Sequence, residues 1–228
     1  MSFLGRHSLP ICFSKHELRA LSPGTPMMLN GRIQRALKSG KLLKLKKGMY
    51  VVAENYIQES DKTKLTEFVA SQLYRPSYIS LEYVLEKHGM LTRADGPILI
   101  TSITTKNTSN FKNFAGNYTY RNVKPSIYFG FEKVIFRDNA YHIATKAKAL
   151  FDHLYLNAKL DCRNGKRLYN QIFKEAAYRW ENFSEEDFRQ FDSYVWKSNS
   201  RKMMKIREVI EKYFDGKKFD MWAKAILS

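Results

Sequence analysis

The pattern of apolar and polar positions near the start of the chain predicts two helices. The segment FSKHEL contains a capping box, because Ser14 and Glu17 can each accept a hydrogen bond from the other's backbone amide. A short helix over residues 15–21 is expected to follow. A second helix is predicted over residues 27–39, where apolar residues recur at helical spacing and Gly40 supplies the terminating left-handed residue. Its apolar positions are Leu29, Ile33, Ala36 and Leu37.

Alternation of apolar and polar residues in LLKLKKGMYVV predicts a β-hairpin directly after the second helix. Strands are expected over residues 42–46 and 49–52, joined by a turn that contains Gly48. The composition of SPGTP, residues 22–26, predicts a turn between the two helices. The order of short helix, turn, helix and hairpin is typical of a winged helix-turn-helix domain.

The rest of the chain predicts a larger mixed α/β domain with a helical C-terminal region, which makes the fold class α+β. ENYIQESDKTK, residues 54–64, is polar and without periodicity, so we expect a linker between domains over residues 1–55 and 64–228. β-Branched and aromatic runs predict the strands, and apolar periodicity predicts the helices. The expected strands are 97–105, 117–123, 126–136 and 140–144, and the expected helices are 65–74, 79–89, 146–158, 166–179, 185–196, 201–214 and 220–227.

Charge is the feature of the composition that most constrains function. The 228 residues carry a formal net charge of +17, and residues 1–55 supply +8 of it through ten Lys or Arg residues against two acids. Such an excess favours an anionic partner: nucleic acid, an acidic membrane surface or an acidic protein. A membrane is disfavoured because the basic elements are short and use their apolar faces internally.

Cysteine content and the length of apolar runs predict the compartment. Cys12 and Cys162 are the only cysteines, too few for a disulfide framework, so a reducing compartment is expected. The start of the chain has no apolar stretch of signal-peptide length, and the longest apolar runs are too short to span a bilayer. We expect a soluble cytoplasmic protein.

The outer faces of the second helix and the hairpin are candidate DNA contacts. Burial of Leu29, Ile33 and Leu37 would point Asn, Gln and Arg side chains outward, and these side chains read base edges in the major groove. Burial of Leu43 and Leu45 would project lysines that clamp phosphates. The alternative is that these charges only solvate a helix and protect an edge strand. The ordered combination of elements favours DNA. The candidate residues are Asn30, Gln34, Arg35, Lys38, Lys44 and Lys46.

Other polar groups predict no catalytic residue, metal ligand or cofactor site. His7, Cys12 and His16 match no common zinc spacing. Asp152 and His153 are adjacent on a predicted helix and do not face each other, so we expect His153 to be structural. No P-loop, GxSxG, HExxH or Rossmann fingerprint occurs in the sequence.

Two further clusters have structural interpretations. Ser184 followed by Glu185, Glu186 and Asp187 is expected to cap a helix and complement its dipole. The aromatic residues between positions 178 and 196 could stack on bases, but their helical spacing favours packing in a core. These residues are Tyr178, Trp180, Phe183, Phe188, Phe191, Tyr194 and Trp196.

Several stretches in this order resemble the AbiEi family, the antitoxins of type IV toxin–antitoxin systems. GRIQRALKSGKLLKLKKGMYV is similar to the winged-helix end of that family, and YRPSYISLEYVLEKHG to the segment after its linker. ITSITTKNTSNFKNFAGNYTYRNVKPSIYFGF resembles the β-rich middle, and IATKAKALFDHLYL the helix that follows. Together the stretches lie between residues 26 and 156, and nothing after residue 157 is specific to the family.

The resemblance implies a bacterial antitoxin without catalytic activity. In that family the winged helix binds and represses the promoter of its own operon, for which inverted repeats are expected. The larger domain counters a nucleotidyltransferase-like toxin. By position, the DNA role falls on the six candidate residues and on Lys47.

Two alternatives remain open from the sequence. One is an enzyme that processes nucleic acid with a catalytic C-terminal domain, and the other is a transcriptional regulator without a toxin. The toxin-neutralising residues and the oligomeric state are not assigned.

Overall fold

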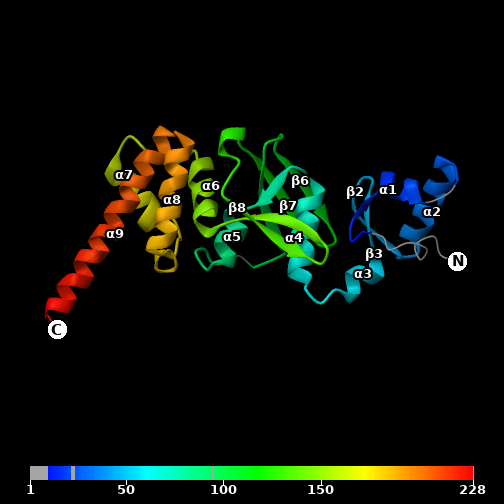
Figure 1. Ribbon diagram of the computed structural model, residues 1–228, viewed down its shortest axis with the longest axis horizontal. Coiled ribbons are helices and arrows are strands. Elements are labelled where there is room, and N and C mark those ends of the chain that lie inside the picture. Colours follow the sequence, from blue (N-terminus) through cyan, green and yellow to red (C-terminus); the bar gives the residue numbers. More distant parts are fainter. Residues whose placement is uncertain (1–9, 22–23, 94, 228) are drawn as a thin grey trace. The chain divides into compact units, whose positions relative to one another are not determined.

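The computed structural model describes residues 10–21, 24–93 and 95–227, with the side chains of these residues through 216 except that of Leu21 (Figure 1). These residues mix helices and strands, which confirms the α+β class. They divide into two compact units. The first runs through Ile79 and adds Gly96–Asn122 and Lys133–His142, and the second comprises Ser80–Asp95, Val123–Glu132 and the residues from Ile143 onward. The units therefore interleave along the chain, whereas the predicted domains 1–55 and 64–228 follow one another.

The first unit begins with the predicted helices and hairpin. They are α1 (Lys15–Leu21), α2 (Pro26–Lys38), β2 (Leu42–Lys46) and β3 (Met49–Val52). The capping box at the start of α1 is confirmed, since the Ser14 amide donates to Glu17 Oε2 and the Glu17 amide donates to Ser14 Oγ. A further strand, β1 (Phe13–Ser14), pairs with β3 in the sheet order β1-β3-β2 among the described residues. Residues 22 and 23 of the predicted turn lie outside the described residues.

Both ends of α2 are fixed by local hydrogen bonds. Thr25 Oγ1 accepts from the Met28 amide at 3.3 Å, and Pro26 occupies the first helical position, where its missing amide hydrogen costs nothing. At the other end the Lys41 amide donates to the Ala36 carbonyl at 2.9 Å, and Gly40, with φ of +69°, donates to Leu37 at 3.2 Å. These two bonds make a Schellman motif, which a residue with positive φ permits.

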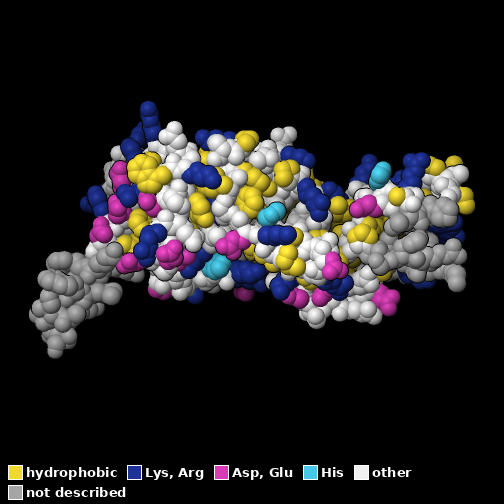
Figure 2. Space-filling model, in the orientation of Figure 1, with side chains coloured by type: hydrophobic (Ala, Val, Ile, Leu, Met, Phe, Trp, Pro, Cys, Tyr) yellow, Lys and Arg dark blue, Asp and Glu magenta, His cyan; other side chains and the backbone are white. Residues whose placement is uncertain are grey.

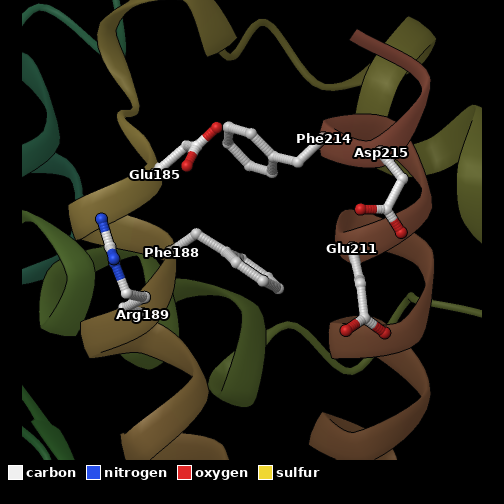
Figure 3. A pocket seen from close by; sticks show the side chains of 6 residues that line it. All are labelled: Glu185, Phe188, Arg189, Glu211, Phe214 and Asp215. Atoms are coloured by element: carbon white, nitrogen blue, oxygen red, sulfur yellow. The ribbon is translucent and has the colours of Figure 1, made fainter. Parts of the chain in front are cut away.

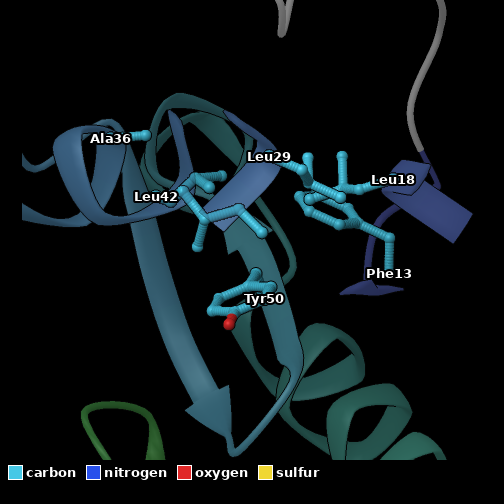
Figure 4. Packing of buried hydrophobic residues seen from close by; sticks show 7 residues of the cluster. Phe13, Leu18, Leu29, Ala36, Leu42 and Tyr50 are labelled. Carbon is cyan, nitrogen blue, oxygen red and sulfur yellow. The ribbon is translucent and has the colours of Figure 1, made fainter. Parts of the chain in front are cut away.

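The apolar face of α2 packs against α1 and the hairpin (Figure 4). The Phe13 and Tyr50 rings on the strands lie with centroids 6.4 Å apart and form one side of this core. Each fully buried Leu or Ile side chain contributes about 1.5–3 kcal/mol, so this small cluster accounts for much of the local stability. Its buried members are Phe13, Leu18, Leu29, Ile33, Ala36, Leu42 and Tyr50.

Most of residues 54–64, where a linker without periodic structure was predicted, is helical. Helix α3 spans Ala53–Gln58, and α4 (Lys62–Leu73) begins after three residues. The sequence of α3 shows no apolar periodicity, because Ala53 is the one buried residue of this helix. Lys62 Nζ donates to the carbonyls of Tyr56 and Ile57, where α3 ends and carbonyls lack helical partners.

The described residues of the β-rich segments form a mixed six-stranded sheet in the order β6-β7-β5-β4-β9-β8. Strands β5 and β7 are parallel, and β4–β5 and β6–β7 are antiparallel. Strands β4 and β6 were not predicted, because SYI is too short and SNFKN too polar to give a strand signal. The strands are β4 (Ser77–Ile79), β5 (Leu99–Thr104), β6 (Ser109–Asn113), β7 (Gly116–Asn122), β8 (Phe131–Phe136) and β9 (Asn139–Ala144).

Helix α4 packs on this sheet with both apolar and hydrogen-bonded contacts. The Tyr120 hydroxyl on β7 donates to the Ala70 carbonyl at 2.5 Å, and the Tyr141 hydroxyl on β9 donates to the Glu67 carboxylate. Both tyrosines are buried, so each hydroxyl has a partner as burial requires. Leu65, Phe68, Val69 and Leu73 are the large apolar residues of α4 that are buried.

The second unit is mainly helical. The predicted helix 166–179 is shorter than expected, because α7 gives way to a π-helical turn over Gln171–Glu175. The predicted break before residue 220 is also wrong, since α9 continues through Gly216, a residue that weakens but does not end a packed helix. The described helices of the second unit are α5 (Leu81–Lys87), α6 (Lys146–Leu156), α7 (Gly165–Asn170), α8 (Glu185–Ser198) and α9 (Arg201–Leu227), with 3₁₀ turns over Pro125–Ile127 and Trp180–Asn182.

A fully buried ion pair lies in the core of the second unit. Lys148 Nζ is 2.6 Å from Asp152 Oδ1, one turn along α6, and it also donates to the Ile127 carbonyl at 3.0 Å. The Phe129 and Phe151 ring centroids lie 4.5 and 4.6 Å from Nζ. Burial lowers the pKa of Lys148, and the Asp152 carboxylate opposes that shift. The Asp152 carboxylate thus stabilises the charged form of Lys148.

Removal of one partner of this pair should be costly. We expect Asp152→Ala to lower the free energy of unfolding by about 3–5 kcal/mol, because it leaves a buried ammonium without its counter-charge. The matched control is Glu175→Ala, which breaks the exposed Arg167–Glu175 pair and should cost less than about 1 kcal/mol. Denaturant unfolding of the two variants measures the difference, and equal losses would contradict the assignment.

Candidate nucleic-acid interface

The predicted base-reading face of α2 is exposed. Asn30, Gln34, Arg35 and Lys38 are all exposed, and Leu29, Ile33 and Ala36 on the opposite face are buried. The helix period therefore separates the two sets as predicted, with Leu37 half-buried at the boundary. Figure 2 shows Lys and Arg side chains on the visible surface over these N-terminal elements.

One side chain of this face is held along the helix. Arg35 Nε donates to the Gly31 carbonyl one turn earlier at 3.3 Å. This bond orients the guanidinium along the helix, while its remaining N–H groups keep their capacity to donate.

The first turn of α2 also carries exposed apolar side chains, which the sequence pattern does not indicate. Met27 is 82% exposed and Met28 is 51% exposed. Their helical spacing relative to Gly31 places them beside the polar face. Exposed methionines in the first turn of a helix add nothing to its apolar period, so their exposure is seen only in the folded structure.

The hairpin departs from strict alternation. Lys44 and Lys47 are exposed as predicted, but the buried leucines of β2 are Leu42 and Leu45, and Leu43 is half-buried. A β-bulge causes this change, because the register moves from Lys44 opposite Tyr50 to Lys46 opposite Met49. The extra residue, Leu45, places its carbonyl within 3.2 Å of Asn113 Nδ2 on β6.

The prediction that Lys46 projects outward from the hairpin is wrong. Its Nζ donates to the Leu73 carbonyl at 2.5 Å and lies 5.5 Å over the Phe111 ring. Leu73 is the last residue of α4, so Lys46 satisfies a carbonyl that has no helical partner. The bulge explains the error, since one inserted residue turns the next side chain to the other face.

Electrostatics at Lys46 reflect its partial burial. Burial lowers the pKa of its ammonium, and the positive charge of Lys106 lowers it further. Lys106 lies 5.8 Å over the Tyr74 ring, whose centroid is 5.9 Å from that of Phe111. Two lysines therefore share one aromatic surface within the first unit.

The residues considered for other chemistry have structural partners. Asp152 bonds to Lys148 and accepts from Ser80 Oγ at 2.7 Å, while His153 contacts the Tyr178 hydroxyl and lies 3.4 Å from Glu82. The two adjacent side chains thus face different neighbours, as predicted. Burial raises the pKa of the Cys12 thiol to about 12, which keeps it protonated and unreactive at neutral pH. His7 lies outside the described residues.

The acidic and aromatic residues after position 177 behave mostly as predicted. Ser184 and Asp187 form a capping box at the start of α8. Tyr178, Trp180, Phe183 and Phe191 are buried in the core. Phe188 and Tyr194 are half-buried, and Trp196 is 60% exposed, so the core interpretation holds for only part of the set.

A cavity of about 230 Å³ lies between α8 and α9 (Figure 3). The Phe188 and Phe214 rings approach each other there with centroids 5.3 Å apart. Glu185 and Arg189 line it from α8, and Glu211 and Asp215 from α9. Its acidic lining contrasts with the basic face of α2, and the sequence did not predict it because it depends on how two helices pack.

Comparisons with known proteins leave the family open. The chain matches no family model and no curated protein. Within the described ranges, no helix has the length and apolar content needed to cross a bilayer. Those same ranges contain no group of three or more His, Cys, Asp or Glu side chains that could hold a metal ion.

The two neighbouring lysines of β2 should differ in their effect on stability. We expect Lys46→Ala to lower the free energy of unfolding by about 1–3 kcal/mol, because the Leu73 carbonyl loses its charged donor. Lys44→Ala, the matched control in the same strand, should change it by less than about 0.5 kcal/mol. Urea unfolding monitored by circular dichroism gives both values. If Lys46→Ala left the free energy of unfolding unchanged, the bond from Lys46 to α4 would contribute nothing to stability.

Proposed function

We propose that the protein is a DNA-binding transcriptional repressor whose N-terminal elements act as a winged helix-turn-helix. The observation that supports this most is the exposed Asn30, Gln34 and Arg35 on one face of α2, opposite a face that is buried. These three side-chain types pair bidentately with adenine and guanine edges. The 13 residues of α2 give a length of about 20 Å, which the major groove of B-form DNA accommodates.

The hairpin supplies the wing in this proposal. Lys44 on β2 and Lys47 in the turn are exposed and can contact phosphates, and Lys38 near the end of α2 adds a third cation. Such contacts set position and affinity and carry no sequence information. Lys46 takes a supporting role, because it holds β2 against α4.

We further propose that the protein is a non-catalytic, cytoplasmic antitoxin of the AbiEi type that represses its own promoter. This part rests on the sequence resemblance between residues 26 and 156. It implies an operator with inverted repeats and a nucleotidyltransferase-like toxin as the activity to be countered. A neighbouring gene with a nucleotidyltransferase signature, whose growth inhibition is relieved by this protein, would support the antitoxin role. A regulator without a toxin would repress its promoter but relieve no such inhibition.

Wing lysines should control the salt dependence of DNA binding. We expect the double variant Lys44→Ala with Lys47→Ala to weaken binding to all duplexes similarly and to reduce the salt slope by up to about two. Each lost phosphate contact removes about 0.9 from that slope. Fluorescence anisotropy over a range of salt concentrations measures it, with Lys174→Ala as a control for loss of an exposed charge in the second unit. An unchanged slope would remove the wing from the proposal.

Gln34 should control sequence preference instead. We expect Gln34→Ala to cost about 1–3 kcal/mol on the preferred duplex and to leave binding to unrelated DNA unchanged. Competition between the promoter duplex and a scrambled duplex of equal length measures the ratio. A uniform loss on both duplexes would show that Gln34 contacts the backbone and not the bases.

A further inference from the structure

Gly31 lies in the middle of the exposed face of α2, where no side chain of the described residues crowds it. Apart from its chain neighbours and the backbone of its own helix, a Cβ built at this position meets no described atom within 4 Å, and the residue has ordinary helical backbone geometry. Glycine is the least favourable residue after proline inside a helix, because it loses the most backbone freedom on folding. Alanine would fit this position and strengthen the helix. No contact among the described residues therefore accounts for the missing side chain.

The neighbours of Gly31 on the helix surface indicate what that use is. Side chains three and four positions away share a face, and here they are Met27 and Met28 on one side and Gln34 and Arg35 on the other. All four are exposed. Gly31 is thus a gap at the centre of a surface with amide and guanidinium groups at one end and apolar groups at the other.

The apolar end of this surface matches one feature of DNA. Met27 is 82% exposed, so the described residues cover little of its side chain. In the major groove the C5-methyl group of thymine is the apolar group that base edges present. A flexible thioether side chain adapts its shape to such a contact.

We propose that α2 approaches the DNA bases most closely at Gly31, and that this approach brings Met27 against a thymine methyl group. The inference rests on the proposed function and adds the class of base pair that the helix reads. A side chain at position 31 would hold the helix away from the groove floor. With glycine at position 31, Met27 would reach the groove and select thymine next to the bases that Gln34 and Arg35 contact.

The first experiment substitutes Gly31→Ala in the full-length protein. We expect a higher melting temperature, because the helix gains propensity, together with at least about tenfold weaker binding to the preferred duplex. That duplex is selected with the wild-type protein from a randomised library. Gly165→Ala is the matched control, because Gly165 also lies in a helix with no described atom within 4 Å of its Cβ position. It should leave DNA binding unchanged.

The second experiment removes the thymine methyl group by replacing single thymines of the selected duplex with deoxyuridine. We expect one replacement to weaken wild-type binding about fivefold or more, and to have no effect on Met27→Ala. Ile57→Ala, which truncates an exposed apolar residue on α3, should keep the wild-type response. This coupling depends on the methyl contact and is not produced by a general loss of stability.

The outcomes separate the inference from the function on which it rests. If the wild-type protein selects no duplex, the proposed function and the inference both fall. If it selects a duplex but Gly31→Ala binds equally well, or every deoxyuridine duplex binds as the thymine duplex does, the inference alone falls. Tight binding by a stabilised Gly31→Ala would be the clearest refutation.

Discussion

The packing of the α2 apolar face against the hairpin is the constraint on which the candidate site depends. Leu29 and Ile33 are buried against Phe13 and Tyr50, which fixes the rotation of the helix about its axis. Because the helix has 3.6 residues per turn, that rotation decides which residues face solvent. The polar face is therefore a consequence of burial on the other side. A repacked core would turn a different set of side chains outward.

Features encoded by neighbouring residues were predictable from the sequence. The Ser14–Glu17 capping box and the Gly40 terminus involve groups within a few residues of one another, so their chemistry is visible in a short segment. The exposed Asn30 and Gln34 followed from the helix period alone. The roles of these residues in binding DNA stay a prediction.

Features that depend on distant partners were not predictable. The β2 bulge positions the Leu45 carbonyl for Asn113, 68 residues later, and directs Lys46 to Leu73, 27 residues later. Nothing within LLKLKKGMYVV distinguishes a regular strand from this one. The buried Lys148 pair is similar, because its aromatic enclosure includes Phe129 from before α6. The interleaving of the compact units likewise reflects strand pairing across the sheet and leaves no mark on composition.

The bonds from β2 to α4 and β6 have a consequence for modularity. Lys46 and the Leu45 carbonyl find their partners at Leu73 and Asn113, so the hairpin is completed by residues that follow it in the chain. A shortened chain that ended near residue 55 would keep the bulged strand but lose these partners. The Leu45 carbonyl would have no Asn113 donor, and the Lys46 ammonium would have neither the Leu73 carbonyl nor the Phe111 ring beside it. The N-terminal elements are therefore poor candidates for transfer to another protein by simple recombination. If the proposed DNA binding holds, a new preference is expected to evolve by point substitution on α2 within the intact chain.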